Sequence, residues 1–228
     1  MFVVGVCIGD EVRYANIAFP AIRQRCPRGT LLIELRDQVS IHAAYNSILA
    51  IARDVPDLDG VIFIHEDLEI LDAELVTKLE GYLRDSSVGI VGAIGAIGVE
   101  SLSWWDGEIR GALMETRGML SFPVSERDVD MVDGCFVALS AAAVRALSFR
   151  EEDYSGFHGY DAEICFAARL AGMRVIVGDF DLFHACRGGL GDVDSYACNN
   201  YVFQERWGLG SGLRSRDEDP THRKAGRG

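Results

Sequence analysis

The sequence predicts an α/β protein with a mixed, mainly parallel central sheet and helices on both of its faces. From residue 2 to about residue 95, continuous apolar runs alternate with longer amphipathic stretches, as they do where helices connect the strands of a buried parallel sheet. The chain has 228 residues, of which 49% are hydrophobic and only 5 are prolines, so it can bury a large core. Polar residues follow the apolar runs directly, at the edge where open α/β sheets bind ligands.

In the first half of the chain, runs of large apolar residues predict four strands, at residues 2–9, 30–35, 60–65 and 87–94. Amphipathic stretches predict three helices between them, at residues 12–26, 40–55 and 72–85. The first helix is interrupted or started near Pro20. Ser40 and Asp72 are the expected N-caps of the other two. The apolar face of the second helix is expected to consist of Ala44, Ile48, Ile51 and Ala52.

The alternation of runs ends near residue 95. Residues 95–131 contain glycines, two adjacent tryptophans and a predicted hairpin at 112–126. The expected later elements are a strand at 129–140, helices at 141–149, 159–173 and 195–208, and one or two strands at 174–185. Gly172 is expected to end the helix at 159–173. The composition of residues 209–228, rich in glycine, serine and charge, predicts a disordered tail after a single domain at residues 1–208.

Charge and cysteine content narrow the functional classes. Lys and Arg total 22 against 35 for Asp and Glu, and the formal charge of −13 disfavours binding to nucleic acid. The 6 cysteines are scattered without a CxxC pair, as is typical of reduced thiols in a cytosolic protein. The N-terminus lacks the features of a signal peptide, and no apolar stretch is long enough to be a transmembrane segment. We therefore expect a cytoplasmic protein, although docking to a membrane through a partner stays open.

Three strand ends are expected on one rim of the sheet: Gly9 with Asp10, Glu34 to Asp37, and His65 to Asp67. Converging carboxylates at such a rim attract a divalent cation, which completes its shell with substrate phosphates. In the segment FIHEDLEI, the candidate ligands are therefore His65, Glu66 and Asp67. The alternative is the ordinary polarity of a junction between a strand and a loop.

Two acidic residues open the helix predicted at 159–173. Asp161 and Glu163 lie in its first turn, where the helix dipole alone favours anions. The functional alternative makes one of them a general base. His158, just upstream, is either a loop residue or a substrate contact.

His184 and the pair Trp104 and Trp105 each have a structural and a functional interpretation. His184 follows an apolar strand and precedes Arg187 and a glycine pair, which favour close approach of a phosphate. A lone histidine is otherwise more often structural. Trp104 and Trp105 lie in a loop rich in glycine and aspartate and cannot both face a core easily, so one of them is a candidate for stacking on a sugar ring.

Six motifs are weak singly but specific as an ordered set. They are AYNSIL at 44–49, FIHEDLEI at 63–70, VDGCFVALS at 132–140, FHGYDAEICFAARLAGMRV at 157–175, LFHACRGG at 182–189 and FQERWG at 203–208. This set resembles glycosyltransferases of the GT-A fold, within or near family two. It is most similar to the small prokaryotic glycosyltransferase-like group associated with capsule and surface polysaccharide synthesis.

The resemblance implies a metal site at the end of the third strand. In such enzymes an Asp-x-Asp motif at this place holds the cation that bridges the donor diphosphate, so Asp67 matches the metal-binding acid and His65 replaces the first Asp. His184 matches a histidine that completes the site, and the implied cofactor is Mn²⁺ or Mg²⁺. Glu34 matches the acid that contacts the nucleobase. The other candidates for donor binding are Asn46, Glu66 and Arg187.

The resemblance also assigns the acceptor side. Asp161 matches the general base that opens a later helix. The candidates for the donor-sugar and acceptor pockets are Trp104, Trp105, Asp133, Gly134, His158 and Glu163. Residues 1–95 would form the nucleotide-binding half of the domain and residues 96–208 the acceptor and catalytic half.

The implied reaction is an inverting glycosyl transfer from a nucleotide sugar, with a UDP-sugar favoured, to a hydroxyl of a glycan, a lipid-linked acceptor or a small molecule. One alternative is a catalytically silent module that binds a nucleotide, a glycan or a protein. The altered Asp-x-Asp motif favours it slightly, whereas the intact set of Asp161, Glu163 and His184 argues against it. Another is a sugar nucleotidyltransferase. That class usually has a glycine-rich loop followed by a basic residue after the first strand, whereas this chain has GDEVR at residues 9–13. The oligomeric state stays open.

Overall fold

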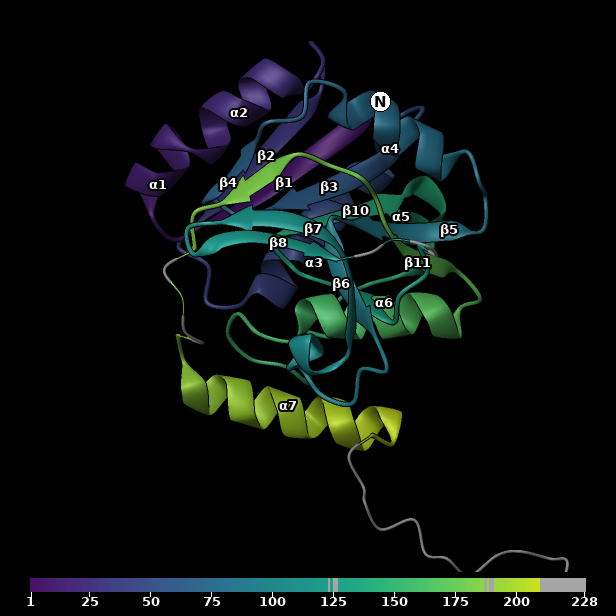
Figure 1. Ribbon diagram of the computed structural model, residues 1–228. Coiled ribbons are helices and arrows are strands. Elements are labelled where there is room, and N and C mark those ends of the chain that lie inside the picture. The colour runs from purple at the N-terminus through teal and green to yellow at the C-terminus, as the bar shows by residue number, and fades with distance from the viewer. Residues whose placement is uncertain (123, 125–126, 187, 189–190, 210–228) are drawn as a thin grey trace, which may run out of the picture.

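Strand β3 (Gly60–Ile64) is buried along its whole length and lies inside a six-stranded central sheet. The computed structural model describes residues 1–122, 124, 127–186, 188 and 191–209 (Figure 1). The other strands of this sheet are β1 (Phe2–Ile8), β2 (Leu31–Arg36), β5 (Val88–Gly92), β10 (Phe136–Ser140) and β11 (Arg174–Val177). Their order is β11-β5-β10-β3-β1-β2, with β10 antiparallel to both of its neighbours and the other pairs parallel. The predicted mixed, mainly parallel sheet is confirmed.

A second sheet contains β4 (Leu68–Ile70), β6 (Ile94–Ile97), β7 (Glu108–Glu115), β8 (Gly118–Phe122), β9 (Met131–Val132) and β12 (Leu182–His184). Its order is β4-β12-β7-β6-β9, and β8 pairs with β7 as the predicted hairpin. The strand predicted at 129–140 divides between the two sheets as β9 and β10, and the strand predicted at 87–94 is β5 with the first residue of β6. Both parts of each run are largely apolar, so the sequence pattern does not reveal the division. Residues 174–185, predicted as one or two strands, form two, β11 and β12.

The helices are α1 (Glu11–Asn16), α2 (Ala18–Arg25), α3 (Ile41–Arg53), α4 (Leu75–Leu83), α5 (Ala141–Ala146), α6 (Tyr160–Leu170) and α7 (Val193–Trp207), with a short 3₁₀ helix η1 (Trp104–Asp106). In Figure 1, α1 and α2 lie beside β2, and α7 lies on the outer side of α6. The helix predicted at 12–26 is two helices that meet at Ile17. Pro20 lies in the first turn of α2, where its missing N–H costs no helical hydrogen bond.

One local prediction is confirmed and two differ. Ser40 is the N-cap residue of α3 as predicted, although its hydroxyl makes no capping hydrogen bond. Asp72 precedes the cap of α4 and instead accepts hydrogen bonds from the backbone of Glu74 at 2.8 Å and from Lys78 at 2.7 Å. Ile51 is 47% exposed, because it falls beside the row formed by the other three residues of the predicted face.

Contacts around β3 give the site a rigid base. Tyr45 of α3 stacks on Phe63 with ring centroids 4.1 Å apart, which fixes this helix against the middle of the sheet. Beyond the strand, the backbone N–H of His65 donates to the carbonyl of Cys135 at 3.0 Å. The polar residues that follow β3 therefore project from a well-anchored sheet edge.

Some predictions fall at the limits of what the structure describes. The proposed disordered tail at 209–228 lies outside the described residues, except for Leu209. The expected boundary between two halves at residue 95 falls within β6. In the described part of the chain, no helix combines the length and the apolar character needed to cross a membrane.

Candidate active site

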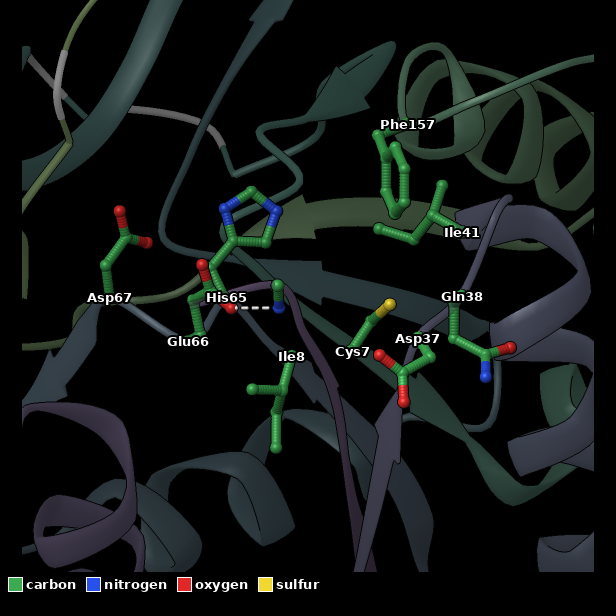
Figure 2. Close-up of a pocket in the computed structure, with 10 residues that line it drawn as sticks. Cys7, Ile8, Asp37, Gln38, Ile41, His65, Glu66, Asp67 and Phe157 are labelled. Atoms are coloured by element: carbon green, nitrogen blue, oxygen red, sulfur yellow. Dashed lines mark hydrogen bonds between the residues drawn. The ribbon is translucent and has the colours of Figure 1, made fainter. Parts of the chain in front are cut away.

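A pocket of about 470 Å³ opens at the C-terminal ends of β1, β2 and β3 (Figure 2). It is lined by Cys7, Ile8, Gly9, Asp37, Gln38, Ile41, His65, Glu66, Asp67 and Phe157. The three strand ends predicted to share a rim therefore meet around one cavity. Figure 2 shows Asp67, Glu66 and His65 toward one end of the pocket and Asp37 and Gln38 toward the other.

The residues best placed to hold a metal are His65, Asp67 and His184, whose ligand atoms all lie within 4.8 Å of one another. Asp67 follows β3, while His184 ends β12, which pairs antiparallel with β4 and so returns to the same edge. His184 Nε2 lies 3.2 Å from Asp67 Oδ1. Two imidazoles and one carboxylate suit Mn²⁺ better than Mg²⁺, which prefers oxygen ligands. The donor set thus fits a divalent cation of the transition series.

Asp67 is suited to bind a cation because it is ionised although only 8% exposed. Burial opposes its charge, but the hydrogen bond from His184, together with the charges of His184 and Arg13, outweighs burial and lowers the pKa of Asp67 to about 2. The guanidinium of Arg13 contacts Asp67 Oδ2 directly. A metal-binding carboxylate must be deprotonated, and Asp67 meets this condition at any physiological pH.

The two histidines of this group differ in their electrostatics. Burial and the nearby His184 lower the pKa of His65 to about 4, so its ring is neutral near pH 7. For His184, burial opposes protonation, but the hydrogen bond to Asp67 and the charge of Asp133 raise its pKa above the usual value. His65 Nε2 also lies 2.6 Å from the hydroxyl of Tyr160. This contact connects the metal-ligand group to the first turn of α6.

The candidate base Asp161 lies in that same turn, beside the loop that joins β9 to β10. Asp161 Oδ1 accepts a hydrogen bond from the backbone of Ala162 at 2.9 Å. Burial and the charge of Asp133 raise the pKa of Asp161 to about 7, although backbone hydrogen bonds oppose the rise. A Cβ atom on Gly134 would lie 2.1 Å from the Tyr160 hydroxyl and 3.1 Å from Asp161 Oδ2, so glycine is required there. A carboxyl group that titrates near pH 7 suits general base catalysis.

Glu115 is an acidic residue of the site that sequence patterns do not indicate. The pairing of β7 with β12 places it opposite His184. Glu115 Oε1 lies 3.9 Å from His184 Nδ1, and Glu115 Oε2 accepts a hydrogen bond from Arg117 at 2.8 Å. The ligand atoms of Glu115, His184 and Cys186 also lie within 4.8 Å of one another. His184 therefore lies between two carboxylates, with Asp67 near one ring nitrogen and Glu115 near the other.

Two of the residues predicted to bind the donor make structural contacts instead. Glu66 lines the pocket, but its carboxylate accepts hydrogen bonds from the backbone N–H groups of Gly9 and Asp10, the second at 2.8 Å (Figure 2 shows the first). It thereby fixes the loop after β1 against the end of β3. Both ends of the Asn46 amide bind the backbone of Phe149, each at 2.8 Å, and Asn46 does not line the pocket. This placement corrects the expected donor-binding role of Asn46.

Glu34 and Arg187 complete the predicted donor-binding set. Glu34 lies on β2, where its carboxylate is 3.7 Å from the guanidinium of Arg36, and it does not line the pocket. Asp37 does line it, with φ at 55°, a left-handed conformation that Asp tolerates better than most residues. The pocket therefore favours Asp37 and Gln38 over Glu34 as ligand contacts. Arg187 lies outside the described residues.

Glu163 does not reach the pocket, which corrects its expected role at the acceptor. It is 1% exposed and lies between α6 and α7. Its carboxylate accepts hydrogen bonds from the Tyr154 hydroxyl at 2.9 Å and from Trp207 Nε1 at 2.8 Å, and it forms an ion pair with Arg206 at 2.8 Å. Glu163 therefore anchors the last helix of the domain.

The two tryptophans separate as their sequence context suggests. Trp104 is buried, whereas Trp105 is 46% exposed. Ser103, the preceding residue, shares a hydrogen bond of 2.7 Å with the hydroxyl of Tyr196, and the Tyr196 ring lies 5.4 Å from that of His158. The tryptophan segment and His158 thus lie near each other at the start of α6. Their contact with a substrate stays a prediction.

The architecture is that of the GT-A glycosyltransferases. The solved structure of GalNAc-T7 with UDP, GalNAc and Mn²⁺ has a TM-score of 0.59 and 9% identity, covering 86% of this chain and 47% of that one. The mannosyltransferase PcManGT from Pyrobaculum calidifontis, in complex with GDP-Man and Mn²⁺, has a TM-score of 0.55 and 13% identity, covering 82% of this chain and 58% of that one. At such identities the likeness establishes the fold.

Sequence comparison adds the family. The profile of the glycosyltransferase like family matches residues 3–205, and the chain belongs to this family. The streptomycin biosynthesis protein StrF of Streptomyces griseus is 28% identical over 183 residues, which are 79% of this chain. The match spans 65% of the length of StrF. The resemblance inferred from the six motifs is thereby confirmed.

Proposed function

We propose that the protein is a metal-dependent inverting glycosyltransferase that moves a sugar from a nucleotide sugar to a hydroxyl acceptor. The strongest support is the juxtaposition of three candidate cation ligands, two of which line one end of the pocket, with the helix that carries the candidate base. His65 belongs to the ligand group and contacts Tyr160, the residue next to Asp161. The raised pKa of Asp161, about 7, suits proton removal from a hydroxyl.

The donor would lie along the pocket. Its diphosphate fits the end at His65 and Asp67, where a cation can bridge protein and phosphate oxygens. Its nucleoside fits the end at Asp37 and Gln38, beside the 47% exposed ring of Phe157, which offers an apolar face to a base. GalNAc-T7 was solved with UDP and PcManGT with GDP-Man, so both nucleotides are candidates, with UDP favoured.

In the proposed reaction, Asp161 takes the proton of the acceptor hydroxyl while that oxygen forms a bond to the anomeric carbon. The bond from this carbon to the donor phosphate breaks on the opposite face, and its electron pair leaves with the nucleoside diphosphate. Bound Mn²⁺ or Mg²⁺ would neutralise the charge of this leaving group, and the imidazole ligands favour Mn²⁺. A single displacement of this kind inverts the anomeric configuration.

The acceptor side is proposed to include Trp105, His158 and the loop at Asp133 and Gly134. Acceptors in surface polysaccharide or glycoconjugate synthesis suit an enzyme of this family. The name of StrF, a streptomycin biosynthesis protein, supports small-molecule hydroxyls as well.

A thermal-shift panel of UDP, GDP, CDP and TDP, each with and without Mn²⁺, tests this proposal. We expect one nucleotide to stabilise the protein, by about 2.7 kcal/mol at a hundredfold excess over its Kd, and mainly when Mn²⁺ is present. In the Asp67→Asn variant, Mn²⁺ should no longer increase the stabilisation of the protein by this nucleotide. A catalytically silent module would show the stabilisation without hydrolysing the matching nucleotide sugar. Failure of all four nucleotides to stabilise the protein would contradict the proposal.

A further inference from the structure

Arg13 makes a contact that neither the motifs nor the proposed mechanism requires. It lies on α1, just after β1, and its guanidinium reaches the end of the second sheet. One terminal nitrogen contacts Asp67 Oδ2, and the other donates to the carbonyl of Ala185, the residue after His184. The side chains of Arg13 and Asp67 are only 20% and 12% exposed. Arg13 therefore bridges the two chain segments that supply the cation ligands.

With this bridge in place, both oxygens of Asp67 have a described partner. His184 lies at Oδ1 and Arg13 lies at Oδ2. A cation that binds Asp67 must displace the guanidinium from Oδ2 or lie close to its positive charge, and either arrangement costs free energy in a partly buried site. The cation and Arg13 thus compete for the same carboxylate.

The displaced guanidinium would need another anionic partner. Arg13 follows Gly9 at the pocket rim by four positions, and Asp67 lies at the pocket end assigned above to the donor diphosphate. A guanidinium binds two phosphate oxygens in the same planar geometry that it uses for a carboxylate. Exchange of one partner for the other keeps the positive charge of Arg13 compensated.

We infer that Arg13 couples cation binding to donor binding: it holds Asp67 when the site contains no cation and transfers to the donor diphosphate when the cation takes Asp67. The inference rests on the proposed function, since it requires a cation at Asp67. It adds that the cation alone binds weakly, and that Arg13 is a diphosphate contact. Arg13 is then a positioning residue for Asp67 in one state and a ligand of the donor in the other.

Direct Mn²⁺ titration without nucleotide, followed by electron paramagnetic resonance of the free ion, tests the competition. We expect Arg13→Gln to bind Mn²⁺ about five- to tenfold more tightly than the unmodified protein, because no guanidinium has to be displaced. Arg13→Lys should be intermediate, since lysine keeps the charge but cannot bridge Asp67 and Ala185 with a planar fork. Arg23→Gln, an exposed position on α2, removes the same charge and should leave Mn²⁺ affinity unchanged.

A second measurement tests the phosphate contact. With Mn²⁺ present, pyrophosphate should stabilise the unmodified protein and Arg23→Gln in a thermal-shift assay and should stabilise Arg13→Gln clearly less. With a chelator instead, the difference between these proteins should disappear, because Arg13 then stays at Asp67. Equal Mn²⁺ affinities in all arginine variants, with binding abolished in Asp67→Asn, would overturn the inference while leaving the metal site in place. Absence of Mn²⁺ binding in every variant would overturn both the inference and the metal dependence of the proposed function.

Discussion

Asp161 and Glu163 lie two residues apart in one turn of α6, yet their surroundings are opposite. Asp161 lies against the loop of Asp133 and Gly134, and burial beside another acid raises its pKa to about 7. Glu163 lies against α7 and has hydrogen-bond or ion-pair partners on three side chains. A carboxylate near a second acid titrates near neutral pH, whereas one with three donors anchors a helix. One helix turn therefore joins the proposed catalytic region of the molecule to a structural one.

The largest expected effect separates the two regions by activity. Asp161→Asn should lower the rate of glycosyl transfer by about 10³-fold, because amide nitrogen and oxygen cannot take the acceptor proton. Nucleotide binding should stay near normal. A single-turnover assay with the donor indicated by the nucleotide panel measures the rate. Asp194→Asn, an exposed position in the first turn of α7, is the matched control. Full activity of Asp161→Asn would exclude Asp161 as the base.

The second largest expected effect is a loss of stability when Glu163 is replaced. Glu163→Ala should lower the free energy of unfolding by about 3 kcal/mol, because it leaves Arg206, Tyr154 and Trp207 without their common partner. Urea denaturation measures the change. Glu205→Ala, an exposed position on α7, should change stability by no more than about 0.5 kcal/mol. A similarly small change for Glu163→Ala would show that α7 does not depend on this anchor.

The pH dependence of the transfer rate tests the raised pKa of Asp161. The transfer rate should rise with pH to a plateau above about 7 and fall about tenfold for each pH unit below it, because only ionised Asp161 accepts the proton. Asp133→Asn should move this limb to lower pH, since it removes the neighbouring charge that raises the pKa of Asp161. An unchanged limb would mean that another group controls the rate.

The raised pKa of Asp161 also makes the free energy of unfolding depend on pH. The folded state binds the Asp161 proton more tightly than the unfolded state does, so its contribution to stability is complete below about pH 4 and is lost as the pH rises through about 7. Asp161→Asn should therefore be more stable than the unmodified protein at pH 8, by about 1 kcal/mol or more, while it is inactive. Urea denaturation of both proteins at pH 5 and pH 8 measures the difference.

The smallest expected effect concerns the metal-ligand group. Glu115→Gln should weaken Mn²⁺ binding about threefold, because a carboxylate near the second ring nitrogen of His184 helps to orient the ring. We expect less than the tenfold typical of a direct partner, since Glu115 Oε1 is 3.9 Å from His184 Nδ1. Glu108→Gln, at the other end of β7 and 70% exposed at its side chain, is the control. Equal affinities in both variants would remove Glu115 from the site.

Sequence patterns located the buried strands and the rim of the pocket, because both depend on local runs of residues. The run at 60–65 predicted β3 and placed His65 and Asp67 at its end. Patterns did not reveal that the apolar runs at 87–94 and 129–140 each cross from one sheet to the other, since both parts of each run are largely apolar. The position of Glu115 opposite His184 depends on strand pairing between distant segments and has no local signal.

Helix geometry could have separated Asp161 from Glu163. Residues two apart on an α-helix point about 200° away from each other, so both could not lie against the same neighbouring element. Which of the two lies against α7 and which against the loop of Asp133 and Gly134 is set by tertiary packing. The GDEVR segment contains Arg13, but its partner Asp67 lies 54 positions away in the sequence. No spacing rule predicts a contact between them.

The turn between β7 and β8 connects neighbouring strands of a single sheet, so it lies apart from the chain segments that pass from one sheet to the other. A longer loop at Thr116 and Arg117 would cost little closure entropy and would leave the core unchanged. It would also lie next to Glu115, and so within reach of the chemistry at His184. An insertion in this hairpin would therefore change the surroundings of His184 with little disturbance to folding.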